Sequence, residues 1–209
     1  MIFGSEKALF SSENSRKLLT AVGIDSLDAA FQQGRVVFDG RHDHKQVACV
    51  SVVVEGDPVR EWHGLNLLRS WGLSAAEPLA LFTRSLSAAS AVVTAGVPGE
   101  HSLRELAGTS FFGDLDADSQ DTLVHEICRA IHIIHDRGYG WRGMDARHLY
   151  PERRSDGGYR IWLLDCEGVH RRRNRSAVDR DIGRLQKSLR KSDVPEAFIR
   201  RLMEGLHRR

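Results

Sequence analysis

The spacing of apolar residues divides the first half of the chain into strand-like runs and helix-like repeats. Apolar residues recur at helical spacing in two segments, and Gly72 ends the second of them. The runs between and after these segments are rich in valine, leucine or alanine and are bounded by glycine, aspartate or proline, which is typical of strands. The pattern predicts helices at residues 15–33 and 59–71 and strands at residues 34–40, 46–56, 77–82 and 87–98.

The second half of the chain is mostly helical in pattern. Ser102 and Glu105 have the spacing of a capping box, which predicts a short helix that begins after Ser102. Two apolar runs flank Asp156, Gly157 and Gly158, which predicts a β-hairpin because such a turn needs positive φ. Further helices are expected at residues 119–137, 176–192 and 195–207. The order of elements therefore predicts an α+β protein with two unequal lobes.

Composition narrows the class of protein. The chain has 209 residues, of which 41% are hydrophobic and 28% charged, as in ordinary globular proteins. No window approaches the roughly 18 apolar residues of a membrane span, and the first residues lack the pattern of a secretory signal. The three cysteines are far apart and odd in number, which favours reduced thiols in the cytoplasm.

The net charge of +2 identifies no partner, but positive charge is concentrated late in the chain. The segment 171–175 contains four arginines, which fits either a solvated loop or a patch that faces anionic lipid or phosphate. No aromatic residues interleave with these arginines, so no nucleic-acid partner is expected.

Five stretches carry a resemblance to a known family. They are REWHGLNLLRSWGLSAAEPLAL, VVTAGVPGEHSLREL, IHIIHDRGYGWRGMDARHLY, IWLLDCEGVHRRR and DRDIGRLQKSL. In this order they resemble the lipopolysaccharide core kinases of Gram-negative bacteria, the Kdo kinase, WaaP and InaA group. The resemblance implies a single domain with a two-lobed protein kinase-like fold. It has a shortened, β-rich N-lobe at about residues 1–95 and a small helical C-lobe at about residues 96–209.

A kinase of this fold holds ATP with a glycine-rich loop, a strand lysine and a helix glutamate. The resemblance places Glu61 at the helix glutamate, although an acidic residue in a first turn is also explained by the helix dipole. The strand lacks a lysine, and Lys45, upstream of it, could instead meet phosphate or lie at a solvated hairpin tip. No glycine occurs between Gly40 and Gly56, so the glycine-rich loop is missing as well.

The catalytic loop departs further from the family pattern, which commonly reads H-x-D-L-N-A-R-H. This chain reads WRGMDARH, so Trp141 replaces the first histidine and Gly143 stands at the catalytic aspartate. Asp145 could take over the catalytic role if the loop is rebuilt, or it could cap the turn. The resemblance places His148 and Asp165 at the metal site of a kinase. Asp165 could also hydrogen-bond the backbone of the catalytic loop and so hold the loop in place.

Two hypotheses follow. The chain is either a degenerate kinase with a binding or regulatory role linked to the lipopolysaccharide core or the cell envelope, or an active kinase. An active kinase would use ATP and Mg²⁺ to phosphorylate an inner-core sugar of lipopolysaccharide, with Asp145 as base. Loss of the loop, the lysine and the aspartate together favours the first hypothesis, since residues that act as a unit are non-additive. The expected partners are a lipopolysaccharide precursor or a protein, in the cytoplasm or in peripheral contact with the inner membrane.

Overall fold

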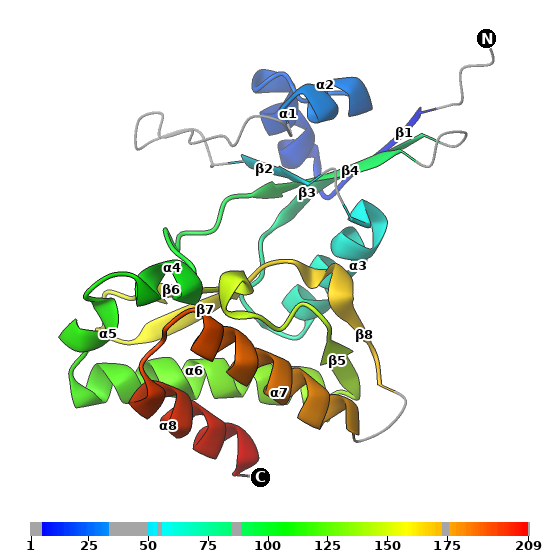
Figure 1. Cartoon of the computed structure of the whole chain (residues 1–209). Helices are drawn as coiled ribbons and strands as arrows, with labels where there is room; N and C mark the ends of the chain where they lie inside the picture. Colours follow the sequence, from blue (N-terminus) through cyan, green and yellow to red (C-terminus); the bar gives the residue numbers. More distant parts are fainter. Residues whose placement is uncertain (1–5, 34–49, 54–55, 85–88, 173–175, 209) are drawn as a thin grey trace. The chain divides into compact units, whose positions relative to one another are not determined.

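The computed structural model describes residues 6–33, 50–53, 56–84, 89–172 and 176–208. The chain divides into two compact units, Met1–Leu67 with Ala76–Gly96 and Leu68–Ala75 with Val97–Arg209. The first unit contains a four-stranded sheet and the second is mainly helical (Figure 1). This confirms the predicted α+β class; that the two units make up a single kinase-like domain stays a prediction.

The sheet of the first unit is antiparallel, with strand order β1-β3-β4-β2. Side chains of β3 and β4 alternate between its two faces, as the two-residue period of a strand requires. Phe82 and Val93 pack on one face with helices α1 and α2, whereas Leu81 and Val92 pack on the other face with Trp62 of α3. The bounds are β1 Glu6–Phe10, α1 Glu13–Ala21, α2 Leu27–Gln33, β2 Val50–Val53, α3 Pro58–Ser70, β3 Pro78–Arg84 and β4 Ser90–Ala95.

Three details of this unit differ from the predicted elements or go beyond them. The single helix expected at residues 15–33 is two helices, because the chain turns at Gly23 with a φ of 75°. Strand β1 is not among the predicted elements, because it has only five residues, which lie at a sheet edge and are mostly exposed. The strand expected at residues 34–40 lies outside the described residues.

The second unit is built around three long helices and confirms the predicted hairpin. Helix α8 packs against both α6 and α7 (Figure 1), and strands β6 and β7 pair across a turn in which Gly157 has a φ of 85°. The capping box of Ser102 and Glu105 is formed. None of the helices in the described ranges combines the length and the apolar character that a membrane span requires.

Apart from α6, α7 and α8, the elements of this unit are short, and the loop of residues 142–148 lies between two of its strands. The bounds are α4 Leu103–Ala107, α5 Phe111–Asp114, α6 Ala117–Asp136, β5 Tyr139–Trp141, η1 Ala146–His148, β6 Leu149–Arg153, β7 Tyr159–Leu163, η2 Cys166–Gly168, β8 Val169–Arg171, α7 Ser176–Lys191 and α8 Glu196–His207. Strand β5 pairs with β8, so the chain before the loop is held beside the chain that follows β7.

Candidate functional site

Two segments of the second unit lie side by side and contain most of the predicted site residues. One is the loop of residues 142–148 between β5 and β6, and the other is residues 164–168 after β7. The amide of Arg142 donates to the carbonyl of Gly168 at 3.0 Å, and the amide of Leu164 donates to the carbonyl of His148 at 3.1 Å. The backbone thus fixes the two segments against each other at both ends.

Gly143 stands where the family pattern has its catalytic aspartate, and the structure leaves no room for a side chain there. A Cβ atom at this position would lie 2.8 Å from the carbonyl oxygen of Asp165 and 2.9 Å from Nε1 of Trp141. It would also lie 3.1 Å from Oδ2 of Asp165. The Trp141 side chain is fully buried, and its Nε1–H donates to the Asp165 carbonyl at 2.8 Å. Trp141 and Asp165 therefore close the space beside Gly143.

Asp165 and His148 are brought together, as the prediction of a shared site requires. Oδ2 of Asp165 lies 3.4 Å from Nδ1 of His148, and Nδ1 also lies 2.7 Å from the carbonyl oxygen of Gly143. Asp165 has a left-handed backbone with a φ of 56°, an uncommon conformation for any residue with a side chain. Burial raises the pKa of the Asp165 carboxyl above its ordinary value, while His148 opposes this rise and Glu167 adds to it.

The donor atoms of this pair do not by themselves fit a magnesium site. A carbonyl oxygen at 2.7 Å can only accept, so Nδ1 of His148 carries a hydrogen and only Nε2 of the neutral ring has a lone pair for a metal. Asp165 then supplies one carboxylate, whereas Mg²⁺ prefers six ligands, mostly oxygen. Within the described ranges, no three His, Cys, Asp or Glu side chains gather as a metal-ligand set. The metal role of Asp165 and His148 stays a prediction.

The carboxylate of Asp145 forms hydrogen bonds within its own turn. Its carboxylate caps η1 by accepting from the amide of Arg147 at 2.9 Å, and it accepts from Nε of the same arginine at 3.1 Å. Burial acts to raise the pKa of Asp145, but hydrogen bonds from Arg147 and Ser188 outweigh it, so the pKa lies below its ordinary value. This geometry matches the turn-capping interpretation; a catalytic role for Asp145 stays a prediction.

Of the remaining two predicted residues, Glu61 belongs to the first unit. Glu61 lies in the first turn of α3 and is buried, with 6% of its surface exposed. Lys45 lies outside the described residues.

Asp181 of α7 supports the loop and was not singled out from the sequence. It is 3% exposed and accepts from the amide of Trp141 at 2.9 Å, and its Oδ2 lies 3.4 Å from Nε2 of the buried His135. A Cβ at position 140 would lie 2.9 Å from the same Oδ2, so glycine allows this close approach. The signal was present, because Asp181 falls among the apolar positions Ala177, Ile182 and Leu185 that form the buried side of α7.

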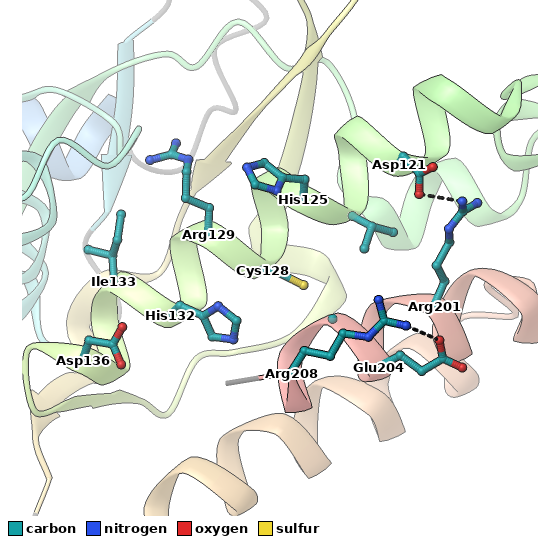
Figure 2. Close-up of a pocket in the computed structure, with 12 residues that line it drawn as sticks. Asp121, His125, Cys128, Arg129, His132, Ile133, Asp136, Arg201, Glu204 and Arg208 are labelled. Atoms are coloured by element: carbon teal, nitrogen blue, oxygen red, sulfur yellow. Dashed lines mark hydrogen bonds and ion pairs between the residues drawn. The ribbon is translucent and has the colours of Figure 1, made fainter.

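A separate hollow of about 730 Å³ lies between α6 and α8 (Figure 2). Four of its charged side chains pair with one another, Arg201 with Asp121 at 2.6 Å and Arg208 with Glu204 at 3.4 Å. Cys128 lies in its lining, and burial raises the pKa of this thiol to about 11, which makes it a poor nucleophile. The hollow contains none of the predicted site residues.

Comparison with known proteins agrees with this geometry. The fold and the paired loops define a protein of the kinase-like class. A model of the lipopolysaccharide kinase (Kdo/WaaP) family matches residues 54–206, and the chain belongs to that family. Among solved structures, one described as WaaP in complex with acyl carrier protein is similar with a TM-score of 0.68 and 17% identity, covering 97% of this chain and 89% of that chain. Among curated proteins, no sequence match was found.

Proposed function

We propose that this member of the lipopolysaccharide kinase family is a degenerate kinase. It does not transfer phosphoryl groups, and it has a binding or regulatory role linked to the lipopolysaccharide core or the cell envelope. The observation that supports this most is the closed space at Gly143. Atoms of Trp141 and Asp165 lie within 3.1 Å of the position that a Cβ atom at residue 143 would occupy. A general base must have an acceptor within hydrogen-bond reach of the substrate proton, and glycine offers none.

The neighbouring carboxylates do not supply an obvious replacement. Asp145 uses its oxygen atoms on Arg147, and Asp165 lies against His148. An aspartate already bound to a guanidinium and held ionised is a poor proton acceptor, because its pKa is lowered further from neutrality. Loss of the base removes the selective need for the glycine-rich loop and the strand lysine, neither of which the sequence contains.

One observation favours the second hypothesis, an active kinase that uses ATP and Mg²⁺ on an inner-core sugar of lipopolysaccharide. The Asp165 carboxylate remains 40% exposed beside His148, which is 20% exposed, so a ligand could reach both. In that case Asp165 and His148 would face the cofactor, and Asp145 would have to leave Arg147 to act as base.

A binding role needs a partner, and two kinds are proposed. One is a precursor of lipopolysaccharide, which the family membership supports. The other is a protein, which the description of the similar WaaP structure as a complex with acyl carrier protein supports. With either partner, we propose that the chain acts in the cytoplasm, with peripheral contact at the inner face of the inner membrane.

A thermal-shift titration with ATP, with and without Mg²⁺, tests the proposal. A ligand that binds only the folded state raises Tm as its concentration passes Kd. We expect no rise at millimolar ATP for the wild type. A Mg²⁺-dependent rise that Asp165→Ala abolishes and Asp118→Ala preserves would contradict a nucleotide-free role. Asp118 is the matched control because it is an exposed aspartate in the first turn of α6, outside residues 142–148 and 164–168.

A further inference from the structure

Helix α7 has four basic side chains along one side. Arg180, Arg184, Lys187 and Lys191 are all exposed, and they recur at intervals of four, three and four residues. At about 100° per residue these positions fall within an arc of about 60°, and at about 1.5 Å per residue they extend over about 16 Å. We call these four residues the α7 basic stripe.

Most of the positive charges of the α7 basic stripe have no negative charge paired with them. Arg184 pairs with Asp181 at 3.5 Å, but Arg180, Lys187 and Lys191 have no carboxylate partner among the described residues. The other acidic residue of the helix, Asp179, lies about 100° away from Arg180 around the axis. The stripe therefore presents a line of positive charge rather than a network of ion pairs.

Stability of the helix does not explain this arrangement. The helix dipole favours a cation in the last turn, which suits Lys191, but it gives no reason for the basic residues Arg180, Arg184 and Lys187 before that turn. Like charges at a spacing of four residues also repel, as Arg180 with Arg184 and Lys187 with Lys191 do. A row of like charges that repel one another and that helix stability does not explain points to a partner outside the chain.

The stripe lies beside the loop that contains Gly143. The guanidinium of Arg184 donates to the carbonyl of Arg142 at 2.9 Å, and Arg142 is itself exposed. Ser188, on the same helix, accepts from the amide of Ala146 at 3.0 Å. A partner on the stripe would therefore be next to the altered loop, within one unit of the protein (Figure 1).

We propose that the α7 basic stripe binds the surface of a membrane that contains anionic lipid. A protein partner would need an apolar centre in the interface, and the only large exposed hydrophobic residue in the described part of the chain is Leu9, in the other unit. A row of lysine and arginine in a unit whose described residues include no large exposed hydrophobic side chain suits attraction to lipid phosphates without insertion. The inference rests on the proposed role at the cell envelope and specifies the surface that makes the contact.

The test is sedimentation of the full chain with vesicles. Vesicles of phosphatidylcholine with 30% phosphatidylglycerol are compared with pure phosphatidylcholine, at low and high salt. The variant Arg180→Gln/Lys187→Gln/Lys191→Gln removes three charges of the stripe. The control Arg104→Gln/Arg153→Gln/Arg200→Gln removes three exposed charges elsewhere in the same unit, none of which has an ion pair among the described residues. Circular dichroism is used to check that both variants fold.

We expect the wild type and the control to bind the anionic vesicles at low salt and to release them at high salt. The stripe variant should bind about 100-fold more weakly, since each of the three basic residues near an anionic surface contributes about a fivefold change. Absence of wild-type binding, or equal loss in the control, would overturn the proposal. Stripe-dependent binding to duplex DNA with none to vesicles would also overturn it. Because the assay contains no nucleotide, its outcome is independent of the ATP titration.

Discussion

The indole Nε1 of Trp141 donates to the main-chain carbonyl of Asp165 at 2.8 Å, and these two residues occupy the space that a side chain at position 143 would need. The family pattern has histidine and aspartate at the positions of Trp141 and Gly143. The two replacements are thus coupled in space, because the larger residue fills the volume beside the smaller one. This coupling distinguishes a rebuilt loop from a loop that has lost one side chain.

Adding a single methyl group at position 143 should destabilise the protein. Gly143→Ala places Cβ within 3 Å of a main-chain oxygen and of the buried indole, so we expect the free energy of unfolding to fall by about 1–3 kcal/mol. Urea denaturation measures this. Gly183→Ala is the control, because nothing lies within 4 Å of its Cβ and the position is an exposed helix site. There alanine should stabilise by up to about 1 kcal/mol; equal effects at both positions would contradict the closed space.

Removing the charge of Asp181 should weaken the support of the loop. Asp181→Asn keeps the shape of the side chain but loses a charged acceptor for the amide of Trp141, which we expect to cost about 2 kcal/mol in the free energy of unfolding. Asp179→Asn, exposed on the same helix, should change it by less than about 0.5 kcal/mol. If the two variants have the same stability, Asp181 is not the support we describe.

Asp165 and Asp145 should affect the pH dependence of stability with opposite sign. Burial raises the pKa of Asp165 in the folded state, so its ionisation costs stability at neutral pH and costs nothing below the unfolded-state pKa, about 3.9. Asp165→Asn should therefore stabilise the protein at pH 7, and the gain should vanish as the pH falls below 4. Urea denaturation at several pH values measures the difference.

The pKa of Asp145 shifts in the opposite direction to that of Asp165. Hydrogen bonds from Arg147 and Ser188 lower its folded pKa, so it contributes stability above the unfolded-state pKa that is lost as the pH falls through the folded value. Asp145→Asn should destabilise at pH 7, and the loss should shrink in acid. If both asparagine variants shift stability in the same direction at pH 7, the account of the two carboxylates is wrong.

The elements that could be predicted from the sequence are those that local chemistry determines. The capping box at Ser102 and Glu105, the hairpin around Gly157 and the long helix α6 each depend on residues close together in the chain. Strand β1 could not be predicted, since its pairing with β3 joins residues 70 or more positions apart. The break at Gly23 was missed because apolar residues continue on both sides of it.

The candidate site could be predicted only in part, for the same reason. Family motifs locate Asp165 and His148, and the structure brings them within 3.4 Å. The closure of position 143 could not be predicted, because Trp141 and Asp165 are 24 residues apart and their contact depends on the pairing of β5 with β8. Asp181 was missed since a buried acid on α7 is meaningful only once its partner Trp141 is known.

The measurement that tests the central claim most directly is transfer of the γ-phosphate of ATP to purified inner-core lipopolysaccharide in the presence of Mg²⁺. The degenerate-kinase account predicts no incorporation by the wild type above that of Asp165→Ala, however long the reaction runs. Incorporation by the wild type that Asp165→Ala and Asp145→Ala both abolish, and that Asp118→Ala leaves unchanged, would contradict the account and establish the chain as an active kinase with a rebuilt catalytic loop.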